Sequence, residues 1–177
     1  IRLVVPTVAG GPSDAAARVL AKGMSAGLGQ EVAVENRPGA GGNIGAEAGA
    51  RAAADGYTLT LAAAGFMAVN PSLYAKLPYD SVKDFAPVSL LVKAPLLLVA
   101  NSTLPSRNVR ELIEFARANP GKLNIGNGGT GTAQHLGGEF FTSAAGISAV
   151  HIPYKGSAPA TNDLLAGVFH AQFDNMV

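Results

Sequence analysis

The chain has 177 residues, enough for one ordinary domain or two small ones, with 48% hydrophobic residues, 14% charged residues and a formal net charge of +1. Its basic residues are scattered singly, without a stripe of Lys or Arg, which excludes the electrostatic surface of a nucleic-acid-binding protein. The chain contains no cysteine, which excludes thiolate metal sites and disulfides, and no apolar run approaches the roughly 18 residues of a membrane span.

The first half of the chain predicts strands that alternate with helices. IRLVVP is a strand that Pro6 ends, and the TVAGGPSD segment that follows predicts a loop, with Ser13 as a helix N-cap and Asp14 in the first helical turn. The expected order is strand 1–6, helix 13–28, strand 31–36, helix 43–54 and strand 57–62. This β-α-β-α-β order predicts an α/β fold with a mostly parallel sheet, flanked by helices and joined by right-handed crossovers.

The second half repeats the alternation after a loop and one short helix within residues 65–81. Two strand-like runs, FAPVSLLV (85–92) and PLLLVAN (95–101), lie on either side of Lys93 and Ala94. The expected order is then helix 108–119, strand 122–127, a Gly-rich loop, helix 132–145, strand 149–154, helix 158–167 and strand 171–175.

Two α/β halves predict two lobes with a ligand cleft between them. We expect a first lobe over residues 1–97 and a second over residues 98–177. Val177 follows a predicted strand directly, without a closing helix. We therefore expect that the natural chain continues past Val177, and that both lobes lack part of their structure here.

The segment GNGGTG satisfies the dinucleotide-binding pattern through Gly126, Gly128 and Gly131. A dinucleotide site requires an acidic residue at the end of the next strand, but that strand ends in Tyr154 and Lys155. No Gly-Lys-Ser/Thr sequence follows either, which argues against a P-loop. A dinucleotide-dependent oxidoreductase fragment is kept as the alternative function.

The same loop offers the peptide N–H groups of Gly128 through Thr132 at the start of a helix, together with two threonine hydroxyls. A helix N-terminus carries about half a positive charge and several unpaired donors, so it binds an anion without a basic side chain. Since the loop has no Lys or Arg, a carboxylate fits better than a pyrophosphate. The alternative is a plain strand-to-helix turn whose glycines serve only backbone geometry.

The loop after the first strand has a similar arrangement, because Gly10 and Gly11 precede a helix start. Two such helix termini are able to hold both ends of a small diacid. Asp14 is expected to interact with the helix dipole. Asp174 stands at the carboxyl end of a strand, where open α/β sheets bind ligands; its alternative role is a turn with Asn175.

The three histidines form no pattern that is typical of a catalytic or metal site. His135 is expected to make an exposed i,i+4 contact with Glu139, while His151 and His170 lie in or beside strands. Their spacing matches no metal site, and no Ser or Thr stands in a nucleophile pattern beside a base. The sequence therefore predicts no enzyme, no catalytic residue, no metal and no cofactor.

Five ordered blocks together resemble one family. These are IRLVVPTVAGGPSDAAAR, VAVENRPGAGGNIGAEAGARAAADGYTL, NPSLYAKLPYDSVKDFAPVSLL, GKLNIGNGGTGTAQHLGGEFF and HIPYKGSAPATNDLLAG followed by FDN. They resemble the extracytoplasmic solute-binding receptors of tripartite tricarboxylate transporters, the Bug family. The resemblance implies a monomeric, periplasmic, two-lobed binding protein of type II that closes on a small mono- or dicarboxylate and delivers it to a membrane permease, or serves a sensor instead.

The resemblance also implies which residues line the ligand cleft. The implied first-lobe residues are Thr7, Ala9, Gly10, Gly11, Gly65, Phe66 and Met67. The implied second-lobe residues are Gly128, Gly129, Thr130, Gly131, Thr132, Tyr154 and Asp174, of which the last two are cleft-edge positions tied to ligand choice. Members of the family commonly have an aromatic residue where this chain has Thr7, a departure that bears on the size of the pocket.

Overall fold

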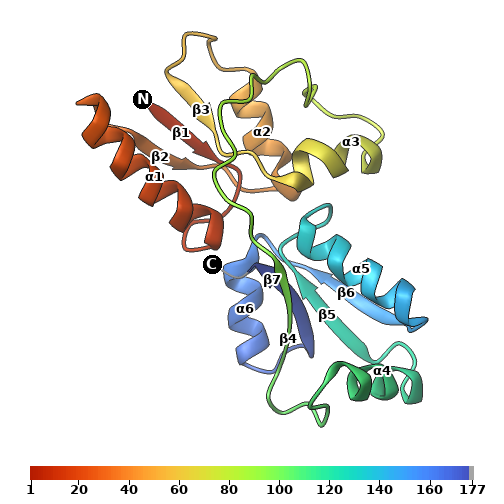
Figure 1. Ribbon diagram of the computed structural model, residues 1–177. Helices are drawn as coiled ribbons and strands as arrows, with labels where there is room; N and C mark the ends of the chain where they lie inside the picture. The colour runs from red at the N-terminus through yellow and green to blue at the C-terminus, as the bar shows by residue number, and fades with distance from the viewer. Residues whose placement is uncertain (176–177) are drawn as a thin grey trace. The chain divides into compact units, whose positions relative to one another are not determined.

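The computed structural model describes residues 1–175 (Figure 1), and the expected continuation past Val177 concerns positions outside these residues. The chain forms two compact units, Ile1–Val92 and Lys93–Val177. The division lies five residues before the boundary expected from the sequence, so the strand that begins at Leu96 belongs wholly to the second unit. No helix of the described chain is long and apolar enough to cross a membrane.

The first unit is built on a three-stranded parallel sheet of order β2-β1-β3. Its strands are β1 (Arg2–Val5), β2 (Ala33–Asn36) and β3 (Thr58–Thr60). The central strand β1 is buried from Leu3 to Val5, because strands border it on both edges and helices cover its faces. This confirms the predicted parallel β-α-β-α-β order.

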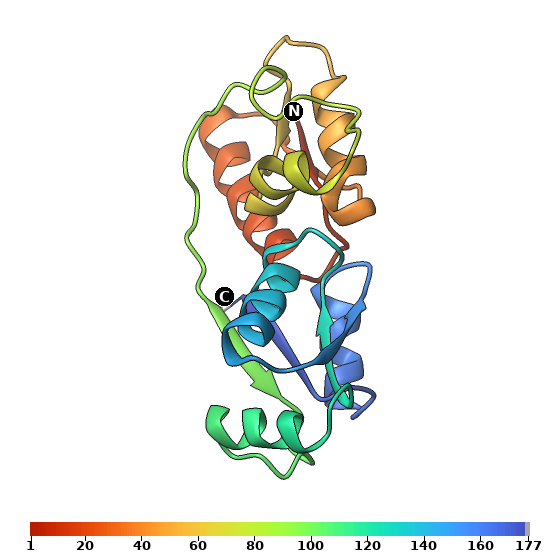
Figure 2. The ribbon, with the colours of Figure 1, turned by 90° about the vertical axis from the view of Figure 1, so that its right-hand side faces the viewer.

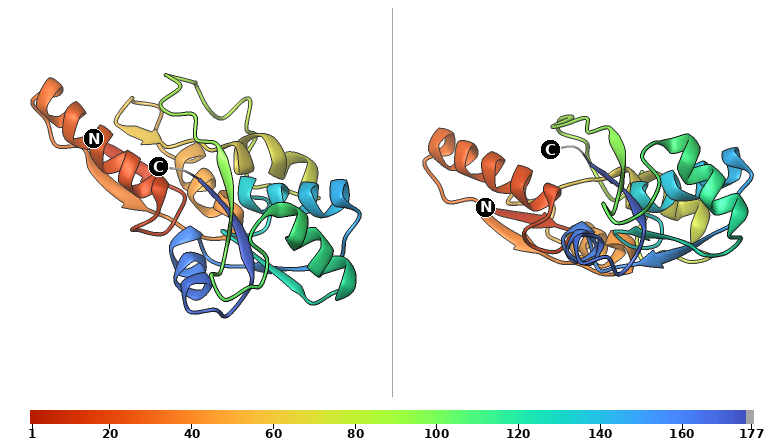
Figure 3. Two further views of the ribbon diagram at one scale, coloured as in Figure 1. Left: turned by 60° about the horizontal axis from the view of Figure 1, so that its bottom comes forward. Right: turned by 90° about the horizontal axis from the view of Figure 1, so that it is seen from below.

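Helices α1 (Pro12–Leu28) and α2 (Asn43–Ala50) cover opposite faces of the sheet of the first unit (Figure 3). The unit also contains the short turn η1 (Ala40–Gly42), the π-helical turn η2 (Gly65–Val69) and the short helix α3 (Asn70–Leu73). Leu3 and Val5 pack against Ala17 and Ala21 of α1. Gly49 of α2 lies against Thr60 of β3, where an added Cβ would come within 2.0 Å of the threonine Oγ1.

The start of α1 differs from the sequence prediction. The N-cap is Gly11 in an extended conformation, and Pro12 rather than Ser13 opens the helix. Pro is favoured at the first helical position because that residue has no intrahelical use for a peptide N–H. No side chain caps the first peptide N–H groups of α1. These donors therefore need partners other than a capping side chain.

The strand predicted over residues 85–92 does not form. These residues have no regular secondary structure, and Figure 2 shows them as an extended stretch without an arrow. Val88, Leu90 and Val92 are 86%, 72% and 60% exposed. A β-strand requires a hydrogen-bonded neighbour, and within residues 1–175 this apolar run pairs with none.

The second unit contains a four-stranded sheet of order β4-β7-β5-β6. Its strands are β4 (Leu96–Ala100), β5 (Leu123–Asn127), β6 (Ala149–Pro153) and β7 (Ala171–Asn175). β5 pairs in parallel with both β6 and β7, whereas β4 runs antiparallel to β7 at the edge. The carboxyl ends of β5, β6 and β7 therefore meet at one edge of the sheet.

Three helices cover the two faces of the second sheet (Figure 1), namely α4 (Val109–Ala118), α5 (Ala133–Ala145) and α6 (Ser157–Leu165). Leu123 and Ile125 pack into a core that includes Leu112 of α4 and Phe141 of α5. The core beneath α6 contains Ala160, Leu164 and Phe169. The alternation of side chains along β5 thus places α5 on one face and α6 on the other.

Candidate functional site

The carboxyl edge of the second sheet brings together the residues that the sequence singled out in this half. The β5–α5 loop (128–132) follows β5, the 154–156 loop follows β6, and Asp174 stands at the end of β7. The first two loops touch, because a Cβ on Gly128 would lie 3.4 Å from both the peptide N and the Oγ of Ser157. Gln134 of α5 also donates to Ser157 Oγ at 3.1 Å.

The β5–α5 loop satisfies part of its own hydrogen-bonding capacity. Gly129 N donates to Asn127 Oδ1 at 3.0 Å, Gly131 N to His135 Nδ1 at 3.4 Å and Thr132 N to the Gly129 carbonyl at 3.1 Å. Of the N–H groups from Gly128 through Thr132 that the sequence offers to an anion, those of these three residues are bound within the chain. Among residues 128–135, the peptide N–H groups without a partner in the described chain are those of Gly128, Thr130, Ala133 and Gln134.

Glycines 129 and 131 are required for this loop geometry. Their φ angles are 123° and 85°, in the region that favours glycine. Thr132 is the N-cap of α5, because its Oγ1 accepts from His135 N at 3.3 Å and donates to the Gly129 carbonyl at 2.7 Å. The Thr132 hydroxyl is therefore part of the helix cap, while Thr130 is exposed.

Asn127, the last residue of β5, is a polar group that the sequence analysis did not single out. Its side chain is 1% exposed, its Oδ1 accepts the Gly129 N–H, and its Nδ2 has no partner within residues 1–175. A buried amide donor without a partner costs about 1–3 kcal/mol. Asn127 Nδ2 is thus a buried donor without an acceptor among the described residues, and it lies beside the free N–H groups of the loop.

Asp174 belongs to a polar cluster with α6. Its Oδ2 accepts from Thr161 Oγ1 at 3.2 Å and from Gln172 Nε2 at 3.1 Å, and its Oδ1 accepts the Asn175 N–H at 2.8 Å. Asp174 and Asn175 both lie in β7, so this contact is local to the strand and is not the turn considered as the alternative. Gln172 is 2% exposed, and its Oε1 has no partner in the described part of the chain.

Tyr154 contacts α6 and the core beneath it. Its hydroxyl donates to Asp163 Oδ2 at 2.8 Å, and its ring centroid lies 5.7 Å from that of Phe169. Burial raises the pKa of Tyr154 above its usual value, and the hydrogen bond to Asp163 raises it further. The hydroxyl therefore stays protonated at neutral pH and acts as a donor.

The carboxyl edge of the first sheet carries the loop that contains Thr7, Ala9, Gly10 and Gly11. Ala9 and Gly10 are exposed and Gly11 is buried. The hydroxyl oxygen of Thr7 is buried and has no partner among the described residues, while the Thr7 carbonyl accepts from Asn36 Nδ2 at 3.2 Å. The first residue of this loop therefore also carries a buried polar atom without a partner among the described residues.

Asp14 in the first turn of α1 holds that loop in place. Its carboxylate accepts from Gly10 N, Arg18 Nε and Asn36 Nδ2, each at 2.9 Å. The Arg18 hydrogen bond is the main reason that the pKa of Asp14 falls to about 2, with Gly10 and Asn36 adding to it against the cost of burial. The expected interaction with the helix start is present, and it takes up the Gly10 N–H.

Gly65, Phe66 and Met67 form the η2 turn of the first unit. Phe66 is 3% exposed and packs with Ala46 and Tyr79, and Met67 is partly buried against the same core. The Phe66 carbonyl accepts the Tyr79 hydroxyl at 2.7 Å. The Phe66 side chain thus belongs to the core, and the Tyr79 hydroxyl holds the Phe66 backbone in place.

The dinucleotide alternative gains no support from the structure. An added Cβ on Gly126 would come within 2.2 Å of Phe169 Cζ, so residue 126 must be glycine for the Phe169 ring to pack against β5. Gly129 and Gly131 serve the turn, and Tyr154 and Lys155 stand where a ribose-binding acid is required. Within residues 1–175 no group of three or more His, Asp or Glu side chains is arranged to hold a metal ion.

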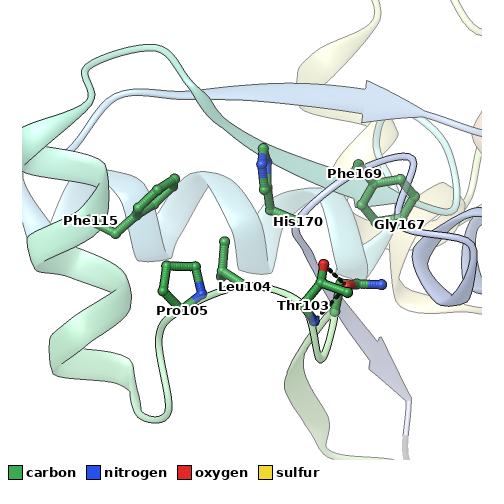
Figure 4. Close-up of a pocket in the computed structure, with 8 residues that line it drawn as sticks. Thr103, Leu104, Pro105, Phe115, Gly167, Phe169 and His170 are labelled. Atoms are coloured by element: carbon green, nitrogen blue, oxygen red, sulfur yellow. Dashed lines mark hydrogen bonds between the residues drawn. The ribbon is translucent and has the colours of Figure 1, made fainter.

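A shallow cavity of about 250 Å³ lies at the opposite edge of the second sheet (Figure 4). It is lined by Asn101, Thr103, Leu104, Pro105, Phe115, Gly167, Phe169 and His170. The Asn101 side chain is bound to Leu164 O and Thr103, and His170 Nδ1 accepts the Asn124 N–H at 3.0 Å. These polar groups are satisfied internally, in contrast to those at the carboxyl edge.

The chain matches the model of one protein family over residues 16–175, and that family is described as the tripartite tricarboxylate transporter family receptor, TctC. The curated protein BugT of Bordetella pertussis is 44% identical over 177 residues, which cover 99% of this chain and 54% of BugT. The chain spans about half the length of the curated relatives it matches.

Three solved structures have the same fold. The periplasmic binding protein BugD is 42% identical with a TM-score of 0.94, covering 99% of this chain and 58% of BugD. An R. palustris protein with adipate is 39% identical with a TM-score of 0.96, covering 99% and 58% of the two chains. MatC from Rhodopseudomonas palustris with bound malate is 32% identical with a TM-score of 0.93, covering 99% and 60%.

These similarities confirm the resemblance found in the sequence and the α/β fold of periplasmic binding proteins. They extend over nearly all of the chain, and they include both the β5–α5 loop and the loop that follows β1. The chain belongs to the family of tripartite tricarboxylate transporter receptors.

Proposed function

We propose that the protein to which this chain belongs captures a small mono- or dicarboxylate outside the cytoplasm and delivers it to a tripartite tricarboxylate transporter. The observation that carries this proposal is the set of unpaired donors at the carboxyl edge of the second sheet. These are the peptide N–H groups of Gly128, Thr130, Ala133 and Gln134 and the buried Nδ2 of Asn127. All are neutral donors at or beside the positive end of α5.

The donor set suits a carboxylate for physical reasons. Hydrogen bonds from peptide N–H groups to an ionised oxygen contribute about 1.5–3 kcal/mol each, more than those to a neutral acceptor. The half positive charge of the helix end offsets about half of the charge of one carboxylate, but only about a quarter of the charge of a phosphate with two charges. A carboxylate oxygen also gives Asn127 Nδ2 the acceptor that residues 1–175 do not provide.

The first unit carries a second group of ligand-binding residues in this proposal. They are the loop over Thr7, Ala9, Gly10 and Gly11 and the Gly65–Met67 turn. The support is the buried Thr7 Oγ1, which lacks a partner in residues 1–175, and the start of α1 without a side-chain cap. Closure of the two lobes on the ligand then shifts the protein from an open to a closed population.

The relatives favour this assignment over chemistry on the ligand. One solved relative is described with adipate and another with bound malate, both small dicarboxylates. We therefore propose a periplasmic, monomeric binding protein without catalysis or cofactor. Its partner is the permease of a tripartite transporter, or a sensor that receives the loaded protein in place of the permease.

Calorimetric titration with malate and adipate tests this proposal. The sharpest variant is Asn127→Asp, which keeps the acceptor for Gly129 N and replaces the free donor by a second negative oxygen. The matched control is Asn124→Asp, which adds the same charge three residues earlier in β5, towards the opposite edge of the sheet. We expect the unchanged protein and Asn124→Asp to bind a dicarboxylate, and Asn127→Asp to bind it at least about tenfold more weakly.

Equal affinities of the two variants would contradict the assignment of the ligand to this edge. Absence of binding by the unchanged protein to a panel of mono- and dicarboxylates would contradict the proposed function itself. Circular dichroism of both variants checks that the charge has not unfolded the sheet.

A further inference from the structure

Two histidines and a glutamate form a cluster on the face of the second sheet that α5 covers. His135 and Glu139 lie one turn apart on α5, and His151 projects from β6. Glu139 Oε1 is 3.5 Å from His135 Nε2 and 3.6 Å from His151 Nε2. The two imidazole rings meet edge to face with centroids 5.9 Å apart. The sequence predicts the His135–Glu139 pair as an exposed contact, whereas the His135 side chain is largely buried and His151 also takes part.

The cluster is built into the packing of α5 on the sheet. The side chains of His135 and His151 are only 17% and 14% exposed, whereas that of Glu139 is 50% exposed. The His151 ring fits because residue 138 is glycine, since an added Cβ there would come within 2.9 Å of the His151 Cε1. Burial lowers the pKa of His151, and the attraction of Glu139 opposes this effect.

His135 connects this cluster directly to the β5–α5 loop. Its Nδ1 lies 3.4 Å from Gly131 N and accepts that peptide N–H, while its own peptide N–H is bound by the Thr132 cap. A ring nitrogen that accepts a hydrogen bond carries no proton, so neutral His135 has its proton on Nε2, the nitrogen next to Glu139. The His135 side chain therefore contacts both the β5–α5 loop, at Gly131 N, and the Glu139 carboxylate.

We propose that His135 is a positioning residue that couples proton uptake to carboxylate capture by the β5–α5 loop. This inference rests on the proposed function of that loop. When Nδ1 gains a proton it can no longer accept the Gly131 N–H. The Gly131 N–H then becomes available to the ligand, and the imidazolium adds a positive charge in the first turn of α5.

The other charged groups around His135 are few. β6 contributes His151, α5 contributes Glu139, and β4 and β5 contain no ionisable side chain. Asp174 of β7 is bound to Thr161 of α6, on the opposite face of the sheet. Arg117 of α4 reaches the Ala145 carbonyl at the far end of α5, and Lys155 lies beyond the end of β6.

The sign of the effect follows from linkage. The protonated form of His135 favours the bound carboxylate, so binding of ligand increases the number of protons held by the protein. Affinity therefore rises as the pH falls through the range of about 5 to 8 in which histidines titrate, and it levels off below that range.

Nuclear magnetic resonance of the ligand-free protein tests the contact itself. We expect the amide signal of Gly131 to move with pH together with the His135 ring signals, because the hydrogen bond breaks when Nδ1 is protonated. The variant His135→Asn keeps an acceptor near the place of Nδ1 but takes up no proton, so its Gly131 amide should be insensitive to pH. The control His151→Asn should keep the titration of Gly131.

Calorimetry with malate then tests the coupling. We expect the dissociation constant of the unchanged protein to be at least about threefold lower near pH 5.5 than near pH 8. In His135→Asn we expect this dependence on pH to be smaller by the same factor. Protonation of malate itself affects both proteins equally. A Gly131 amide that does not follow His135, or a His135→Asn variant with an unchanged pH profile, overturns the coupling alone. Failure of malate and of every other carboxylate to bind at any pH overturns the proposed function, and the coupling with it.

Discussion

The ring of Phe169 lies against the backbone of Gly126, so closely that a Cβ at position 126 would stand 2.2 Å from the ring Cζ. Gly126 is the fourth residue of β5, and Phe169 is the fully buried centre of the core beneath α6. The first glycine of the GNGGTG segment is therefore explained by packing. The approach of a nucleotide is not needed to account for it.

Gly126→Ala is predicted to destabilise the second unit. The ring atoms within 2.7 Å of the new methyl group must move, and overpacking of a buried site costs about 1–3 kcal/mol. Urea unfolding should show the loss as a lower midpoint. The double variant Gly126→Ala, Phe169→Leu should recover part of the loss, because the smaller side chain leaves room for the methyl group. Additive effects of the two changes would contradict the proposed clash.

Asp14→Asn is predicted to destabilise the first unit at neutral pH by about 2 kcal/mol, since it removes a buried carboxylate with three donors. The effect should depend on pH in a definite direction. Arg18 and the other donors lower the pKa of Asp14 from 3.8 to about 2, so the folded state favours the ionised form.

The contribution of Asp14 is complete above its unfolded pKa and is lost as the pH falls from about 5 towards 2. Urea unfolding of the unchanged protein and of Asp14→Asn at pH 7 and pH 3 measures this. The difference in unfolding free energy between the two proteins should shrink at pH 3. A difference that stays constant between the two pH values would show that the carboxylate charge is not responsible.

Titration with NADH or NADPH is predicted to leave cofactor fluorescence unchanged at millimolar concentrations. Gly126 is needed for packing, Gly129 and Gly131 for the turn, and the end of β6 carries Tyr154 and Lys155 without an acid. Saturable enhancement of fluorescence that malate does not displace would revive the oxidoreductase alternative.

The sequence predicted most of the fold because each element has a strong local signal. Pro6, Gly29, Pro120 and Gly146 end elements at or near the expected places, and the alternation of strands and helices indicates parallel sheets. The run at 85–92 has the composition of a strand, but pairing depends on a neighbouring strand, which composition does not encode.

The candidate site was predicted only in part, because its hydrogen bonds depend on side-chain orientation and, at His151, on a contact between two elements. The glycine loop and its helix start are local features, so the sequence located them. The partners of Gly129 and Gly131 depend on the orientation of the Asn127 and His135 side chains, and His151 joins Glu139 from another element. A polar residue directly before a glycine loop, as at Asn127, and the i,i+4 spacing of His135 and Glu139 are the signals that point to these contacts.

Amide chemical shifts during a titration with malate or adipate test the central claim most directly, because that claim concerns individual peptide N–H groups. We predict that the amide signals of Gly128, Thr130, Ala133 and Gln134 and the side-chain amide of Asn127 move downfield on saturation, as donors to an anion do. Saturable binding that leaves these five groups unmoved and shifts signals elsewhere would contradict the account.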